Sequence, residues 1–162
     1  MKYLKPISKY KWNSGCGDIV FFDDIIEDIR FHTKNGGNIY IGADSQIHGT
    51  TCTFVTAICL HGGDKKASRY YFKREPQIKY PNRNLRNRIN EEVTRAIDVF
   101  LYLSDTVPDI KVEIHIDIGS TEKSRTRTLV DSITGWVKGF GVPYKIKPDA
   151  WASAAVADRH TK

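Results

Sequence analysis

The chain has 162 residues, of which 40% are hydrophobic and 27% are charged, as in an ordinary globular domain with a substantial core. Every apolar run is too short to span a bilayer, so we expect no contact with a membrane. No apolar stretch follows the lysines of the N-terminal sequence, which argues against a signal peptide and favours a cytoplasmic protein. The net charge of +6 is compatible with an anionic partner.

The first half of the chain predicts an arm, a helix and three strands. Residues 1–22 mix lysines with aromatic side chains and show no clear period, so we interpret them as an N-terminal arm. The stretch from Phe22 to about 34 has an apolar stripe with helical spacing. Strand-like runs follow over 38–46, 51–61 and 68–73. The short turns between these runs predict an antiparallel meander.

The period then changes to that of alternating helices and strands. Apolar residues recur at steps of three and four over about 84–103, which predicts a long amphipathic helix. The remaining elements that we expect are a strand over 111–118, a helix over 129–140, a strand over 142–147 and an Ala-rich helix over 149–160. This order predicts one α/β domain over residues 23–162. Its mixed five-stranded sheet would have three antiparallel strands, then two parallel ones, with helices on both faces.

Carboxylates stand at positions that a purely structural design does not favour. Asp44 and Asp117 each end an apolar strand, and if these strands are parallel neighbours, both acids emerge at the same edge. Glu92 is the acid within the apolar stripe of the long helix. Asp149 opens the final helix, where it can also act as a cap. Asp158 competes for this role, but it lies about 13 Å further along the helix, which we expect to carry it away from the edge.

Acids that converge at one edge repel each other, and divalent cations relieve this repulsion. Oxygen ligands favour Mg²⁺ or Mn²⁺ over zinc. Taken singly, each acid also has a structural interpretation as a turn cap, a helix cap or a member of an ion pair. His115 has the same strand parity as Asp117, and we interpret it as a core residue.

The segments IYIGADSQ, RNRINEEV, VEIHIDIGS and KPDAWASAAVADRHTK contain these acids. From about residue 20 to the end, the chain resembles a family of small bacterial and phage proteins predicted to be relatives of ribonuclease H. The resemblance implies a ribonuclease-H-like fold. It also implies that Asp44 is the first-strand aspartate, Glu92 the first-helix glutamate and Asp117 the fourth-strand aspartate. The last acid would be Asp149 or, failing that, Asp158, since the pair Ala157-Asp158 resembles the final motif of ribonuclease H.

The resemblance further implies a metal-dependent nuclease that hydrolyses phosphodiester bonds. Two Mg²⁺ or Mn²⁺ ions would activate water and stabilise the leaving 3′ oxygen. Asp44 would bridge both ions, with Asp117 and Glu92 on one side and Asp149 on the other. No Ser-His-Asp or Cys-His pattern offers a protein nucleophile instead.

Basic side chains flank two of the acids and are our candidates for contacts with DNA, RNA or a hybrid. Cations near a helix N-terminus oppose the helix dipole, so they either bind phosphate or pair with acids elsewhere. The sequence leaves both interpretations open and does not indicate the oligomeric state. The candidates are Lys79, Arg83, Arg86 and Arg88 before and within the long helix, and Lys123, Arg125 and Arg127 at the expected start of the next helix.

Three other functions fit the same pattern. The first is an inactive nucleic-acid-binding domain of this fold, whose binding would survive chelation of metal. The second is another metal-dependent phosphoesterase, which would act on nucleotides without regard to polymer length. The third is a structural or assembly protein, whose acids are caps and ion pairs and whose stability does not respond to metal.

Overall fold

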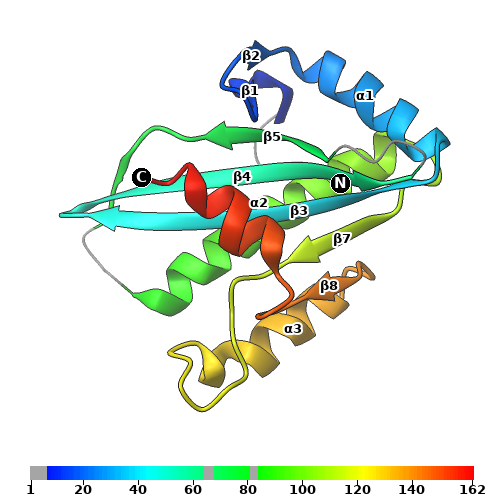
Figure 1. Ribbon diagram of the computed structural model, residues 1–162. Helices are drawn as coiled ribbons and strands as arrows, with labels where there is room; N and C mark the ends of the chain where they lie inside the picture. Colours follow the sequence, from blue (N-terminus) through cyan, green and yellow to red (C-terminus); the bar gives the residue numbers. More distant parts are fainter. Residues whose placement is uncertain (1–6, 64–67, 81–83) are drawn as a thin grey trace.

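The computed structural model describes residues 7–63, 68–80 and 84–162. Its centre is a long antiparallel hairpin, in which β3 (Gly37–His48) pairs with β4 (Thr51–Gly62) along its whole length. β5 (Arg69–Arg74) pairs antiparallel with the other edge of β4 (Figure 1). The predicted antiparallel meander is therefore confirmed.

Two parallel strands continue the sheet on the other side of β3. β7 (Val112–His115) pairs parallel with β3, and β8 (Tyr144–Lys145) pairs parallel with β7. The ladder between β3 and β7 joins Ile39–Gly42 to Val112–His115. Beyond His115 the chain follows β8 instead, since the Ile116 N–H donates to the Lys145 carbonyl at 2.9 Å. The two strands thus part just before Asp44 and Asp117, and the space between them opens.

Within the described residues the sheet has eight strands, and not the five that we predicted. The additional strands are short: β1 (Trp12–Ser14), β2 (Ile19–Val20) and β6 (Ile78–Lys79). β1 and β2 form a hairpin that pairs with β5, after the 3₁₀ turn η1 (Ile7–Lys9). Residues that we predicted as an arm therefore extend the sheet. Strands of two or three residues carry no alternating pattern, and pairing with a neighbour decides their conformation.

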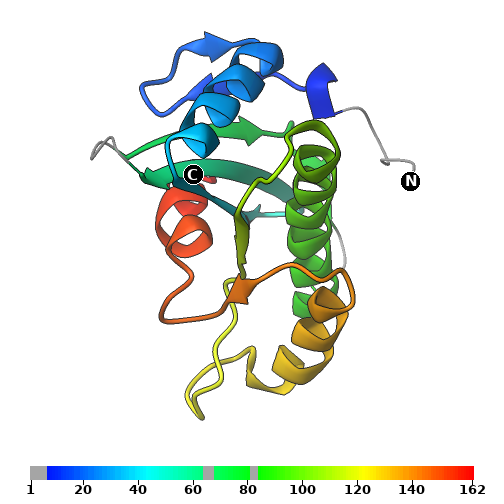
Figure 2. The ribbon, with the colours of Figure 1, turned by 90° about the vertical axis from the view of Figure 1, so that its right-hand side faces the viewer.

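Helices cover both faces of the sheet, as predicted. α1 (Phe22–Lys34), α2 (Leu85–Thr106) and α3 (Val130–Lys138) pack their apolar side chains into one large core with β3 and β4. The final helix η3 (Ala152–Ala157) lies on the opposite face from α2 (Figure 2). There Ala152 and Ala157 contact a smaller apolar cluster that includes Val55 and Ala57. Within the described ranges, no helix combines the length and apolar character that crossing a membrane requires.

The final helix differs from the regular α-helix that we predicted. Ala152–Ala157 are π-helical, and helical backbone continues through Asp158. A π-helix bonds residues five apart and has a wider turn than an α-helix. The direction in which Asp158 projects is therefore not the one that a regular α-helix would give it.

Candidate active site

A cavity of about 570 Å³ opens where β3 and β7 part. Its walls come from β3, from the first turns of α2, from the loop after β7 and from the segment before η3. Three of the predicted acids line it. The lining residues used below are Asp44, Arg88, Glu92, Asp117, Gly119, Lys123, Ser124, Arg125, Thr126 and Lys147.

Asp44 is the acid whose surroundings most oppose its charge. It lies within β3 and is 8% exposed. Burial is the largest cause that raises the pKa of Asp44 to about 9, and the charges of Glu92 and Asp117 act in the same direction. The neighbouring carboxyl group of Asp158 raises the pKa of Asp44 further.

Glu92 reaches the cavity from α2. Its carboxylate accepts a hydrogen bond from the Ser45 hydroxyl. Burial raises the pKa of Glu92 to about 7, although this hydrogen bond and the nearby charge of Arg88 act in the opposite direction. Because neighbouring side chains of a strand point to opposite faces, Ser45 faces α2 while Asp44 faces η3. Asp44 and Glu92 therefore approach the cavity from the two faces of β3.

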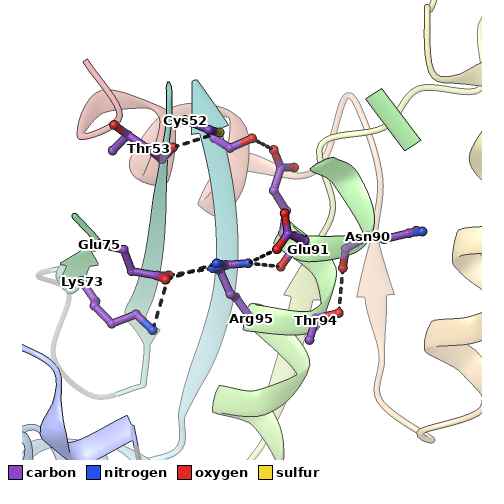
Figure 3. A network of polar contacts seen from close by, with 10 residues as sticks. Cys52, Thr53, Lys73, Glu75, Asn90, Glu91, Thr94 and Arg95 are labelled. Atoms are coloured by element: carbon purple, nitrogen blue, oxygen red, sulfur yellow. Dashed lines mark hydrogen bonds and ion pairs between the residues drawn. The ribbon is translucent and has the colours of Figure 1, made fainter. Parts of the chain in front are cut away.

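A partly buried polar network holds the turn of α2 that carries Glu92. The Arg95 Nε and Nη2 atoms donate to the two Glu75 oxygens at 2.7 and 3.2 Å, and Nη1 donates to the Glu91 carbonyl at 3.0 Å (Figure 3). The guanidinium also stacks over the Phe54 ring, 3.9 Å from its centroid. The Lys73 ammonium lies 3.7 Å from Glu75 Oε2. The network thus links α2 to β4 and β5 beside the cavity.

Asp117 follows β7 and faces the segment before η3. The Lys147 Nζ atom lies 3.0 Å from Asp117 Oδ1. This oxygen is buried, and it accepts no hydrogen bond of good geometry from the described part of the chain. Its charge is therefore balanced by Lys147.

The structure brings Asp158, and not Asp149, to Asp44. Asp149 is exposed, and its charge acts on His115. Our expectation that the helix carries Asp158 away from the edge is wrong, because the final helix runs in the same direction as β3. The Ala152 N–H contacts His115 of β7 at the start of the helix, while the Thr161 hydroxyl bonds Gln46 Oε1 of β3 at 3.1 Å beyond its end.

His115 is a buried core residue, as interpreted from the sequence, and it also fixes the final helix. Its Nδ1 accepts the Ala152 N–H at 3.0 Å, so the proton belongs on Nε2, which lies 2.8 Å from Glu113 Oε1. Burial is the main cause that lowers the pKa of His115, although the hydrogen bond with Glu113 opposes this. The neutral ring ties the end of β7 to the helix that carries Asp158.

The donor atoms fit a hard divalent cation in their chemistry. All are carboxylate oxygens, and the negative charges of Glu92 and Asp117 act on Asp44. Asp117 Oδ1 accepts no hydrogen bond of good geometry from the described part of the chain. As the side chains stand, no three or more His, Cys, Asp or Glu residues in the described ranges form a group that could hold a metal ion. The residues that would hold such an ion are Asp44, Glu92, Asp117 and Asp158. Because the pKa of Asp44 is raised to about 9, binding at neutral pH would require Asp44 to lose its proton.

The predicted phosphate contacts divide into two groups. Arg88, Lys123 and Arg125 line the cavity. The others are not part of its lining: Lys79, Arg86 and Arg127 are exposed on the surface, and Arg83 lies outside the described residues.

The predicted helix start at 123–127 is wrong. The Gly119 N–H donates to Thr126 Oγ1 at 2.9 Å, and Ser124 Oγ lies 2.9 Å from the same atom. These hydroxyl groups offer the backbone an alternative to helical hydrogen bonds. A loop over 119–126 results, followed by the 3₁₀ turn η2 (Arg127–Leu129). Ser45 and Lys147 were not among the predicted site residues, although they stand within the segments IYIGADSQ and KPDAWAS.

A mixed sheet of antiparallel and parallel strands with helices on both faces is consistent with the ribonuclease-H-like class. The chain matches the Ribonuclease H-like family over residues 20–162, and it belongs to this family. It is also similar to the uncharacterized protein YkuK of Bacillus subtilis (strain 168), with 29% identity over 160 residues that cover 87% of this chain and 91% of the relative. No solved structure gives a significant match.

Proposed function

We propose that this protein is a metal-dependent nuclease that hydrolyses phosphodiester bonds with two Mg²⁺ or Mn²⁺ ions. The observation that carries the proposal is the burial of Asp44 beside Glu92, Asp117 and Asp158, which raises its pKa to about 9. A divalent cation relieves such repulsion. Membership of the Ribonuclease H-like family supports a nuclease-type activity.

The chain's own residues divide the work as follows. Asp44, Glu92, Asp117 and Asp158 would hold the ions, with Asp158 in the role that the sequence suggested for Asp149. When bound, the ions would activate water and stabilise the leaving oxygen. Arg88, Lys123 and Arg125 would bind the phosphates beside the scissile bond, which positions the substrate without reading its bases.

Cleavage assays test the proposal directly. The substrates are labelled single-stranded and duplex DNA, RNA, a DNA–RNA hybrid and four-way junctions, each with Mg²⁺, Mn²⁺ or EDTA. We expect metal-dependent cutting that Asp44→Asn abolishes and that the matched control Asp149→Asn retains. If wild-type protein cuts no substrate but still binds nucleic acid in EDTA, the chain is a binding domain and the nuclease proposal is rejected.

The size of the cavity favours one second candidate, a phosphoesterase that acts on single nucleotides. Its volume of about 570 Å³ lies within the usual range for small-molecule sites. Such an enzyme would hydrolyse nucleotides and short oligonucleotides at similar rates, with little dependence on salt. A nuclease would gain affinity with polymer length and lose it as salt rises.

A further inference from the structure

Lys147 is the cation in closest contact with the candidate site. Its Nζ atom lies 3.0 Å from Asp117 Oδ1, and its side chain is 48% exposed. The Lys147 N–H donates to the Ile118 carbonyl at 2.9 Å, so the backbone of Lys147 is fixed beside the end of β7. The backbone of Lys147 is therefore anchored, while its side chain, which ends in the ammonium group, is half-exposed.

The oxygen that Lys147 contacts is one that a cation would need. Asp117 Oδ1 is buried and accepts no hydrogen bond of good geometry within the described ranges. A divalent ion bound by Asp44 and Asp117 would sit where the ammonium now balances the charge. Two cations at one carboxylate oxygen repel each other, so the ion and Lys147 compete for it.

Displacement of Lys147 leaves its charge inside the cavity. The same cavity is lined by three other basic residues, Arg88, Lys123 and Arg125. The displaced ammonium of Lys147 would add a fourth positive charge to the surface that faces a ligand. A lysine suits this exchange because its charge is compact and its four-carbon stem is flexible. An anionic phosphate is the ligand that such a surface attracts.

We propose that Lys147 is a positioning residue that neutralises Asp117 before metal ions bind, is displaced by them, and then binds a phosphate of the substrate. The part of this proposal that concerns substrate rests on the proposed nuclease function. The part that concerns metal does not require cleavage, and a titration without nucleic acid tests it alone.

The first test titrates Mn²⁺ into the protein without nucleic acid and follows free Mn²⁺ by electron paramagnetic resonance. Lys147→Met removes the competing ammonium, and we expect its apparent Kd for Mn²⁺ to fall roughly two- to fivefold, the range for loss of a half-exposed ion pair. Lys123→Met is the matched control, since it removes the same charge from the same cavity wall, and Lys123 has no ion pair with an acid among the described residues. A Kd for Lys147→Met that equals or exceeds that of Lys123→Met overturns the proposal.

The second test measures binding and cleavage of the best nucleic acid substrate. We expect Lys147→Met to weaken both while it strengthens Mn²⁺ binding, an opposition that a merely structural lysine does not produce. Lys147→Arg keeps the charge and should retain nucleic acid binding. Lys147→Gln also removes the charge, and it replaces Lys147→Met if melting curves show that the latter is unfolded. Wild-type protein that binds Mn²⁺ but cuts nothing rejects the nuclease and leaves the Mn²⁺ comparison valid. Unchanged nucleic acid binding in Lys147→Met overturns the role toward phosphate.

Discussion

The backbone of Ala152 lies directly on Gly42. A β-carbon at Gly42 would be 2.4 Å from the carbonyl carbon of Ala152, and as close to the amide nitrogen of Ser153. Real β-carbons do not approach a backbone so closely, so only glycine allows η3 to rest on β3 at this point. Asp44 is two residues further along β3, so this contact fixes the position of η3 beside the part of the strand that carries Asp44.

Replacement of Gly42 by alanine should therefore destabilise the protein. The neighbours are backbone atoms that cannot rotate away, and we expect Gly42→Ala to lower the free energy of unfolding by about 3 kcal/mol. Gly135→Ala is the control, since no atom lies within 4 Å of its added carbon and the residue is in α3, where alanine stabilises by up to about 1 kcal/mol. Urea unfolding measures both. Equal changes in the free energy of unfolding for the two variants would show that the backbone of η3 shifts at little cost to accommodate a β-carbon at Gly42.

The two candidates for the last acid differ in their expected effect on cleavage. We expect Asp158→Asn to lower kcat/KM by at least about 100-fold, because even indirect partners of metal ligands contribute 10- to 100-fold. Asp149→Asn should stay within about twofold of wild type, since Asp149 is exposed and is not part of the cavity lining. Initial rates on one substrate at saturating Mg²⁺ provide the comparison. The reverse order of the two variants would return the role to Asp149.

Stability should fall as pH rises when no metal is present. Burial and neighbouring acids raise the pKa of Asp44 to about 9 from an ordinary value of 3.8. Between these values the folded protein holds a proton that the unfolded chain has released, so the free energy of unfolding decreases with pH across that window. Melting temperatures in EDTA between pH 5 and pH 9 measure the decline. Mg²⁺ should reverse part of it at pH 8, because it replaces the proton as the balancing charge.

Asp44→Asn provides the control for this pH dependence. The amide does not titrate, so we expect the variant to lose less stability than wild type between pH 5 and pH 9 and to be the more stable of the two at pH 8. Asp131→Asn removes an exposed acid of α3 and should follow the wild-type curve. Parallel curves for wild type and Asp44→Asn would place the decline elsewhere in the molecule.

The network around Arg95 should contribute more to stability than an ion pair at the surface. Glu75→Gln leaves Arg95 and Lys73 without their shared counterion in a poorly exposed site, and we expect a loss of about 2–3 kcal/mol. Glu27→Gln breaks an exposed pair with Arg30 and should change stability by less than about 0.5 kcal/mol. Chemical denaturation of both variants tests this difference. Similar losses would mean that solvent screens the buried pair as well.

The long elements could be predicted from the sequence because their patterns are locally complete. The run over 51–61 became β4, and the stripe over 84–103 became α2 with only small changes at the ends. Asp44 and Asp117 followed from the expected parallel pairing of their strands, which the structure confirms. Glu92 followed from its place in an apolar stripe, and it is buried.

What could not be predicted depends on contacts between distant residues. β1 is a strand because it pairs with β5, and β2 is a strand because it pairs with β1. A segment of three residues such as Trp12–Ser14 is too short for a pattern that predicts this pairing. The choice between Asp149 and Asp158 depends on the direction in which η3 crosses β3, which spacing along one helix does not reveal. No sequence pattern marks Lys147 as a site residue, because its role depends on its ion pair with Asp117, which is distant in the sequence.

The parting of β3 and β7 divides the sheet into two mechanical units. One unit consists of β3, β4 and the strands that pair beyond β4, and the other consists of β7 and β8. The ladder between the two units joins only Ile39–Gly42 to Val112–His115. A ligand bound in the cavity contacts residues of both units, so it couples their motions. Slower amide hydrogen exchange should then spread from the cavity to β8 as well as to β4, so that occupancy of the site is felt across the whole sheet.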